Sequence, residues 1–232
     1  MLQNPLFCLI LTAVVSYLLG SFNAAIISTK LIMGKDIRTI GSGNAGFTNS
    51  MRTGNKTVAI LSLLGDIVKV GIAVYIGGFL MYNCFDGEIF DYSWILGAYV
   101  AGVSAQIGHI FPLYFGFKGG KGVLTLAAMM LFIDWRVFVI SVIICWGILM
   151  LCTRTVSLSV LITLPVFIIC AVIFAPSGNI QIFNLSFPIS VITIGVSVLM
   201  SVIVIVKHKD NIKRILNGTE SKVGQKADIN KN

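Results

Sequence analysis

Charged residues are scarce in this chain, forming only 11% of its 232 residues, whereas 56% are apolar and the mean hydropathy is +0.94. This composition excludes an ordinary soluble domain, in which about a quarter of the residues carry charge. Several apolar stretches approach or exceed the roughly 20 residues that a helix needs to cross a bilayer. The sequence therefore predicts an all-α, polytopic membrane protein.

Other absences narrow the class further. The chain has only two histidines, and its five cysteines form neither a CxxC pair nor a Cys/His set at metal-ligand spacing, so we predict no metal and no cofactor. The net charge of +8 comes from basic residues in short connections and in the C-terminal tail. Positive charge there is usual for membrane proteins, and we expect no nucleic-acid partner. No basic segment precedes the first apolar stretch, which favours a retained helix over a removed signal peptide.

Seven apolar segments are candidate membrane helices, covering approximately residues 6–30, 57–82, 93–110, 120–133, 136–152, 157–175 and 188–206. The connections between these segments alternate along the chain: a connection with an excess of Lys and Arg is followed by one whose charge is acidic, balanced or absent. Because cytoplasmic loops carry the excess of Lys and Arg, the N-terminus is predicted outside and the tail inside. We thus expect a seven-span domain over residues 1–206 and a basic cytoplasmic tail over 207–232, disordered from about residue 218.

A first glycine-rich polar segment, residues 41–52, is predicted to lie at the cytoplasmic face. Glycines allow several backbone N–H groups to converge on one anion, and Arg52 can form two parallel hydrogen bonds to a phosphate. The alternative is a solvated turn with helix caps. The candidate substrate-binding residues are Gly41, Ser42, Gly43, Asn44, Gly46, Thr48, Asn49 and Arg52.

A second glycine-rich segment, residues 108–122, is predicted at the same face. It lacks the Ser or Thr and the preceding strand of a nucleotide-binding P-loop, so we exclude that function. A helix expected to begin near Gly120 would direct its N–H groups and Lys121 toward a phosphate, with Lys118 and Gly119 beside them. His109 is either a structural hydrogen-bonding residue or a polar contact in the site.

A few further polar residues have two open interpretations each. Asp66 and Lys69 lie three residues apart on one face of a membrane helix, near mid-bilayer, so they must face the protein interior. They form a structural ion pair or serve a function. Ser157 is an N-cap or a substrate contact. His208 belongs to a basic patch that is attracted to anionic lipid or, as the family resemblance described next implies, to the site.

Three stretches closely resemble one family of bacterial enzymes: GSGNAGFTNSMR at 41–52, GHIFPLYFGFKGGKGVLT at 108–125 and TRTVSLS at 153–159, supported by KHKDNIKRILNGTE at 207–220. They are similar to the membrane acyltransferases that move an acyl group from acyl phosphate to glycerol 3-phosphate. The resemblance covers nearly the whole chain. It departs from the family at Ala45 and Phe47, where Pro and Ala are common, so the contacts of the first segment are the part least defined by it.

The resemblance implies a seven-span enzyme of the bacterial plasma membrane that acts on the cytoplasmic side. It would acylate the 1-hydroxyl of glycerol 3-phosphate, giving lysophosphatidate and phosphate for phospholipid synthesis. We expect its partners to be acyl phosphate, glycerol 3-phosphate and the bilayer, and the protein to be a monomer or weak oligomer. The positions that match the family's glycerol 3-phosphate binding or catalytic residues are Ser42, Arg52, Lys121, Ser157, His208 and Asn211.

For catalysis, we predict roles for Lys121, His208, Asn211 and His109, with direct attack of the hydroxyl on the acyl carbonyl. The His-x4-Asp pair of other glycerolipid acyltransferases is absent. The proton acceptor is left open between a substrate phosphate oxygen, His109 and His208. The main alternative function is a membrane transporter of a phosphorylated metabolite, which would need a polar path to the external side, where the connections carry no matching cluster.

Overall fold

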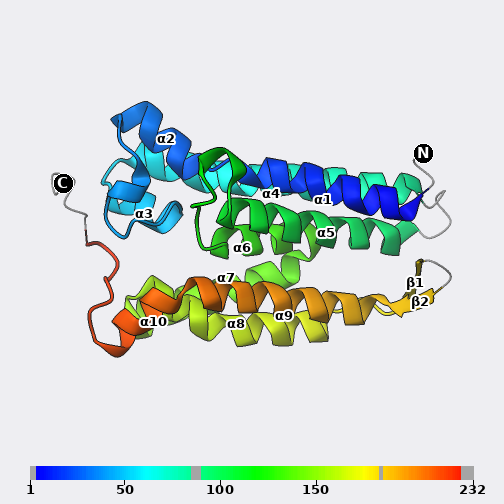
Figure 1. Cartoon of the computed structure of the whole chain (residues 1–232). Coiled ribbons are helices and arrows are strands. Elements are labelled where there is room, and N and C mark those ends of the chain that lie inside the picture. Colours follow the sequence, from blue (N-terminus) through cyan, green and yellow to red (C-terminus); the bar gives the residue numbers. More distant parts are fainter. Residues whose placement is uncertain (1–3, 85–89, 183–184, 226–232) are drawn as a thin grey trace.

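The protein is a long helical bundle in the computed structural model, which describes residues 4–84, 90–182 and 185–225 (Figure 1). Its first half contains α1 Pro5–Ser21, α2 Ala24–Met33, η1 Ile37–Thr39, α3 Phe47–Arg52, α4 Lys56–Cys84, α5 Phe90–Ile110 and η2 Leu113–Phe115. Its second half contains α6 Val123–Ile133, α7 Trp135–Ile148, η3 Leu149–Thr153, α8 Val156–Ile173, β1 Asn179–Ile182, β2 Leu185–Pro188, α9 Ile189–Lys207 and α10 Lys209–Leu216.

Six segments in the described part of the chain are long and apolar enough to cross a membrane. They are Pro5–Met33, Lys56–Cys84, Tyr92–Phe115, Trp135–Thr153, Val156–Ile173 and Ile189–Lys207. The helix α6 is also apolar but has only 11 residues. The predicted helical membrane class is confirmed, whereas the number of seven spans stays a prediction.

The first predicted span is not one continuous helix. It divides at Phe22 and Asn23, which have extended backbone conformations. The Asn23 side chain accepts a hydrogen bond from the Ile26 N–H group at 3.0 Å and so caps α2. From α4, the Lys69 ammonium donates to the freed Phe22 carbonyl at 2.9 Å. A tertiary contact thus satisfies the backbone group that the break exposes.

The helices α1, α4 and α5 form the first layer of the bundle (Figure 1). The backbones of α1 and α5 approach closely because glycine lies at the contact. A Cβ atom at Gly20 would overlap the Ala105 carbonyl oxygen, and one at Gly108 would overlap the Tyr17 carbonyl oxygen. Small residues permit this kind of close helix packing inside a membrane.

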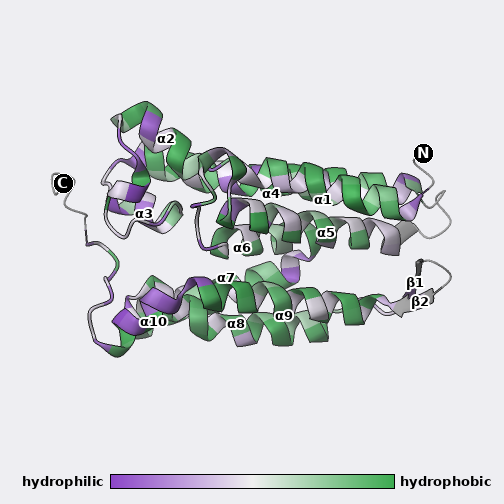
Figure 2. Ribbon diagram, viewed as in Figure 1, coloured by the Kyte–Doolittle hydropathy of each residue, from purple (hydrophilic) through white to green (hydrophobic). Residues whose placement is uncertain are grey.

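The two ends of the bundle differ in polarity. The start of α1 and the antiparallel β1–β2 hairpin lie at one end, and α2, α3 and α10 lie at the other (Figure 1). Figure 2 shows apolar residues along the long helices and hydrophilic ones concentrated near α3 and α10. The hairpin, in the uncharged 176–187 connection, was not predicted from the sequence.

The tail packs back on the bundle beyond α10. Glu220 bonds with residues of α8 and α10, and the Val223 N–H group donates to the Arg154 carbonyl at 2.8 Å. Residues 220 and 223 thus contact the bundle, and the disorder expected for the end of the tail stays a prediction. The remaining tail residues, 226–232, lie outside the described residues.

Candidate active site

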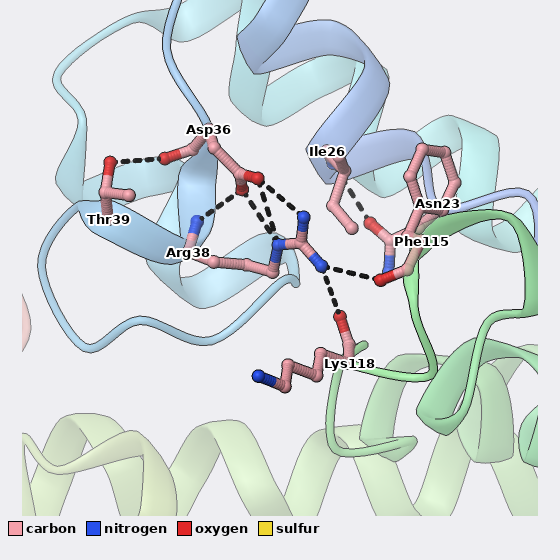
Figure 3. Close-up of polar contacts among 7 residues, drawn as sticks. All are labelled: Asn23, Ile26, Asp36, Arg38, Thr39, Phe115 and Lys118. Carbon is pink, nitrogen blue, oxygen red and sulfur yellow. Dashed lines mark hydrogen bonds and ion pairs between the residues drawn. The ribbon is translucent and has the colours of Figure 1, made fainter.

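Arg38, just before the first glycine-rich segment, bonds with the second one. Its Nη1 group donates to the carbonyl oxygens of Phe115 at 2.7 Å and Lys118 at 3.3 Å (Figure 3). Asp36 holds the other side of the guanidinium, with an Nη2–Oδ2 distance of 2.6 Å. The hydrogen bond from Arg38 lowers the pKa of Asp36, so the pair stays ionised at neutral pH. The sequence prediction did not include Arg38 in the site.

The first segment is shaped by Asn49, whose side chain is buried. Its Oδ1 atom accepts from the Ser42 N–H group at 3.0 Å. Its Nδ2 group donates to the carbonyl oxygens of Ile37 at 3.1 Å and Ile40 at 2.8 Å. Although Asn49 borders the cavity described below, its polar atoms are used in holding the turn that ends at α3.

The second segment packs tightly on the end of α5. The Gly119 N–H group donates to the Ile110 carbonyl and the Gly120 N–H group donates to the His109 carbonyl, both at 3.1 Å. The helix expected to begin near Gly120 begins instead at Val123, so that expectation is wrong. These two N–H groups are bonded within the protein and do not form the free helix N-terminus that the sequence suggested for a phosphate.

A cavity of about 550 Å³ lies between the glycine-rich segments and the helices α6 to α8. The predicted site residues that line it are Ser42, Asn44, Gly46, Thr48, Asn49, Arg52, His109, Lys121, Ser157, His208 and Asn211. The other predicted site residues, which do not line it, are Gly41, Gly43, Lys118, Gly119 and Gly120.

A hydrogen-bonded network closes one side of the cavity. The Lys121 Nζ group donates to Asn211 Oδ1 at 2.6 Å. The two hydrogens of Asn211 Nδ2 go to Ser157 Oγ and Glu220 Oε1, each at 2.7 Å. Ser157 Oγ also donates to Glu220 Oε1 at 2.7 Å. Glu220, whose other oxygen accepts from Arg214 at 2.7 Å, is a site residue that the sequence prediction missed.

The charges around this network favour an anion. Burial lowers the pKa of Lys121 to about 8, against the opposing attraction of Glu220. Burial and the neighbouring Lys121 cation lower the pKa of His208 to about 4, so this imidazole is neutral at pH 7. Arg52 is half-buried, and its guanidinium makes no hydrogen bond or ion pair with the residues that the structure describes. An unpaired guanidinium and an ammonium in one cavity are suited to a phosphate.

The opposite part of the cavity is apolar and is formed by three apolar helices. Its lining consists mainly of Leu126 and Met130 of α6, Phe138, Val142, Cys145 and Trp146 of α7, and Val160, Leu164 and Phe167 of α8. Cationic and apolar halves in one continuous cavity suit a molecule with an anionic head and a hydrocarbon chain.

The buried residues Asp66 and Lys69 form the predicted ion pair, with an Nζ–Oδ1 distance of 2.7 Å. His109 contacts both of them. Among the described residues, there is no group of three or more His, Cys, Asp or Glu side chains that could hold a metal ion.

The bundle and its two-part cavity define the class: a membrane-embedded helical protein with a site for an amphiphilic phosphate. The chain belongs to the glycerol-3-phosphate acyltransferase family, whose sequence profile matches residues 10–218. The chain is 41% identical over 211 residues to the glycerol-3-phosphate acyltransferase of Bartonella henselae, covering 90% of this chain and 89% of that protein. The corresponding protein of Mesorhizobium japonicum is 38% identical over 219 residues, or 94% and 98% of the two chains.

Two solved structures are similar along nearly their full length. They are crystal structures of PlsY (YgiH), an integral membrane glycerol 3-phosphate acyltransferase. Its glycerol 3-phosphate form has a TM-score of 0.75 and 28% identity, with 93% of this chain and 96% of that chain covered. Its lysophosphatidic acid form has a TM-score of 0.72 and 27% identity, with 94% and 96% covered. The predicted acyltransferase family is confirmed, and the protein is an integral membrane enzyme with several apolar helices.

Proposed function

We propose that this protein transfers an acyl group from acyl phosphate to the 1-hydroxyl of glycerol 3-phosphate, at the cytoplasmic face of the bacterial plasma membrane. The products are lysophosphatidate and inorganic phosphate. The observation that carries the proposal is the cavity itself, in which the cationic groups of Arg52 and Lys121 adjoin an apolar space between membrane helices. The family membership and the glycerol 3-phosphate and lysophosphatidic acid forms of PlsY support the same acceptor and product.

The polar half of the cavity contains two sets of phosphate-binding groups, as the two substrates require. Lys121, Ser157 and Asn211 surround the phosphate of glycerol 3-phosphate in this proposal, and His208 lies beside its hydroxyl groups. Arg52 and Ser42 line the same cavity, and the Arg52 charge interacts with those of Lys121 and Glu220, so we place both on glycerol 3-phosphate as well. Asn44 and Thr48 of the first glycine-rich segment hold the acyl phosphate group. All of these groups belong to one chain, so we propose that the monomer is active.

The reaction needs no covalent enzyme intermediate. The glycerol oxygen attacks the acyl carbonyl carbon, a new C–O ester bond forms, and the bond between that carbon and the phosphate oxygen breaks. The phosphate leaves with the bonding electrons, and the hydroxyl proton ends on one of its oxygens. Lys121 and Arg52 stabilise the developing negative charge, and the two binding sites supply proximity.

Transport of a phosphorylated metabolite fits the cavity less well. A transporter needs polar groups along a path to the opposite face, whereas the deeper lining of this cavity is apolar and reaches Met130 and Phe167. Such a lining accommodates a hydrocarbon chain and opposes the passage of a hydrated phosphate ester.

The test uses the purified full-length protein in phospholipid nanodiscs with acyl phosphate and radiolabelled glycerol 3-phosphate. We expect labelled lysophosphatidate and one phosphate released per acyl group transferred. Parallel reactions contain acyl-CoA or acyl carrier protein thioesters, and a matched Arg52→Ala protein is the control for contaminating activity. Product with a thioester but not with acyl phosphate would refute the proposed donor, and no product with any donor would refute the proposed reaction.

A further inference from the structure

A charged pair lies beneath the second glycine-rich segment and contacts the His109 ring. Asp66, Lys69 and His109 are all buried, with exposed fractions of 1%, 7% and 3%. The Lys69 Nζ atom lies 2.7 Å from Asp66 Oδ1, 2.9 Å from the Phe22 carbonyl oxygen and 3.0 Å from His109 Nδ1. An ammonium has three hydrogens and no acceptor. Lys69 donates to the Phe22 carbonyl oxygen, forms a hydrogen bond with His109 Nδ1 and holds the Asp66 carboxylate as an ion pair.

These contacts determine which ring nitrogen of His109 carries hydrogen. Because Lys69 can only donate, His109 Nδ1 must present its lone pair to Lys69. The alternative partner of Nδ1 is Asp66 Oδ1, which lies farther away at 3.3 Å. A neutral imidazole that accepts through Nδ1 carries its hydrogen on Nε2.

The Nε2 edge of His109 lies against the second glycine-rich segment. A Cβ atom at residue 120 would overlap His109 Nε2, so this edge lies against Gly120, next to Lys121 in the chain. His109 also lines the cavity together with Lys121 and Arg52. We propose that Asp66 and Lys69 fix His109 as the Nε2–H tautomer, so that His109 acts in the cavity as a hydrogen-bond donor to a substrate oxygen and not as the proton acceptor. The catalytic part of this inference rests on the proposed acyl transfer.

The other histidine of the chain has the opposite arrangement. His208 Nδ1 lies 2.8 Å from the Val204 carbonyl oxygen, which can only accept, so this nitrogen carries the hydrogen and Nε2 has the lone pair. His208 can therefore accept a hydrogen bond from a substrate hydroxyl and orient it. One histidine donates and one accepts, which leaves an oxygen of the departing phosphate as the final acceptor of the proton.

Because the chain has only two histidines, NMR can test this proposal directly. The full-length protein is labelled with ¹⁵N-histidine and reconstituted in bilayers, and His208→Gln is used only to assign the two signal sets. We expect a hydrogen on Nε2 of His109 and on Nδ1 of His208, unchanged between pH 6 and pH 9. A hydrogen on Nδ1 of His109, or an imidazolium ring at pH 7, would overturn the proposal. In Lys69→Met, His109 should move toward the Nδ1–H tautomer, because Asp66 becomes the remaining partner of that nitrogen.

Enzyme kinetics test the donor role separately. His109→Gln keeps an N–H donor, whereas His109→Leu has similar bulk and none. We expect His109→Leu to lose about 100-fold in kcat and His109→Gln to keep activity within about tenfold of the wild type, the range expected for loss or retention of one oxyanion donor. The pH profile of His109→Gln should match that of the wild type. Equal losses in both variants would contradict the donor role, whereas an inactive wild type would refute the reaction and leave the tautomer result standing.

Discussion

Lys121 is the cation best placed to act on the substrate, because it reaches the cavity from a backbone segment that is held on both sides. We expect Lys121→Ala to fold and to lose about 10²–10³-fold in kcat/KM for glycerol 3-phosphate, the usual effect of removing one charged contact to a transition state. Lys118→Ala is the matched control, since Lys118 is exposed and does not line the cavity. Initial rates and the melting temperature are measured for both variants. Similar rates in the two would contradict the role of Lys121.

The lowered pKa of Lys121 predicts an alkaline limit to activity. With a pKa of about 8, the side chain is charged below that pH and loses its charge as the pH rises through it. The kcat/KM for glycerol 3-phosphate reports the free enzyme, so we expect it to fall about tenfold per pH unit above pH 8. In Lys121→Arg, the guanidinium stays charged, and any activity that remains should persist to higher pH. A decline at the same pH in both proteins would assign it to another group.

Glu220 should determine the pH above which kcat/KM for glycerol 3-phosphate falls. Its carboxylate attracts the Lys121 cation and so raises the pKa of Lys121 against the effect of burial. Glu220→Gln keeps an oxygen that can accept from Ser157 and Asn211 but removes the charge. We expect the alkaline decline of kcat/KM to move to lower pH, with a several-fold loss of activity at pH 8. Asp134→Asn, which removes a carboxylate outside this cavity, is the control and should leave the profile unchanged.

Single side chains show what the sequence could and could not predict about the site. Arg52, Lys121 and His208 were predicted from a motif, and each lines the cavity. Arg38 and Glu220 were missed, because each acts on residues that are distant in sequence. Nothing local indicates that Arg38 bonds with residues 115 and 118, or that Glu220 meets Ser157. Their roles depend on packing that brings loops from different helices together.

The helices α6, α7 and α8 determine how much room an acyl chain has. Met130 of α6 is buried and lines both the main cavity and a second cavity of about 470 Å³, which also borders Tyr99 and Asp134. Its side chain therefore separates the apolar end of the site from additional space. The acyl-chain preference should depend on the size of this one residue.

Met130→Ala should favour longer acyl phosphates. Each additional buried methylene contributes about 0.8 kcal/mol, so kcat/KM should rise about fourfold per methylene where the wild type reaches its limit. Met130→Phe should shift the preference to shorter chains. Met200→Ala, a buried methionine that lines neither cavity, controls for loss of stability. Competition between acyl phosphates of different length measures the ratio, and identical length profiles in all four proteins would contradict the assignment.

Helix boundaries follow the sequence only where local signals determine them. Lys56–Cys84 and Ile189–Lys207 match the predicted apolar runs closely, because a long apolar segment in a bilayer has little alternative to a helix. The break at Phe22 and the late start of α6 at Val123 were not predicted. Both depend on tertiary hydrogen bonds, from Lys69 to Phe22 and from Gly120 to His109, that stabilise non-helical backbone.

The bundle as a whole places every functional segment at one end. Lys121, just before α6, bonds with Asn211 of α10, and Arg154, just before α8, bonds with Val223 of the tail. The α6–α7 unit therefore starts and ends at the same face. At about 1.5 Å per residue, the 11 residues of α6 span only about 16 Å, less than a bilayer core of about 30 Å. The α6–α7 unit therefore returns the chain to the side of the membrane from which it started, both when α6 crosses the whole bilayer and when it crosses only part of it.

This geometry makes the orientation testable without a decision on the number of spans. If the α1–α2 segment, α4, α5, α8 and α9 each cross once, they add five crossings, an odd number, and we predict that the N-terminus and the tail lie on opposite sides. The excess of Lys and Arg in the tail and in residues 31–56 predicts that this end of the bundle lies in the cytoplasm. Single cysteines replace Asn4, Ser177 or Lys213 in a protein otherwise free of cysteine and shown to be active. All three positions are exposed.

An impermeant maleimide applied to intact spheroplasts should label Asn4→Cys and Ser177→Cys but not Lys213→Cys, and permeabilised cells should label all three. Labelling of Lys213→Cys alone in intact cells would invert the orientation and place the substrate cavity outside, away from cytoplasmic glycerol 3-phosphate. Labelling of Ser177→Cys but neither terminus would indicate an even number of crossings and would contradict the contacts of Lys121 and Arg154 with the tail. The expected pattern requires that the glycine-rich segments, α10 and Glu220 meet at the cytoplasmic surface, where both proposed substrates can reach the same cavity.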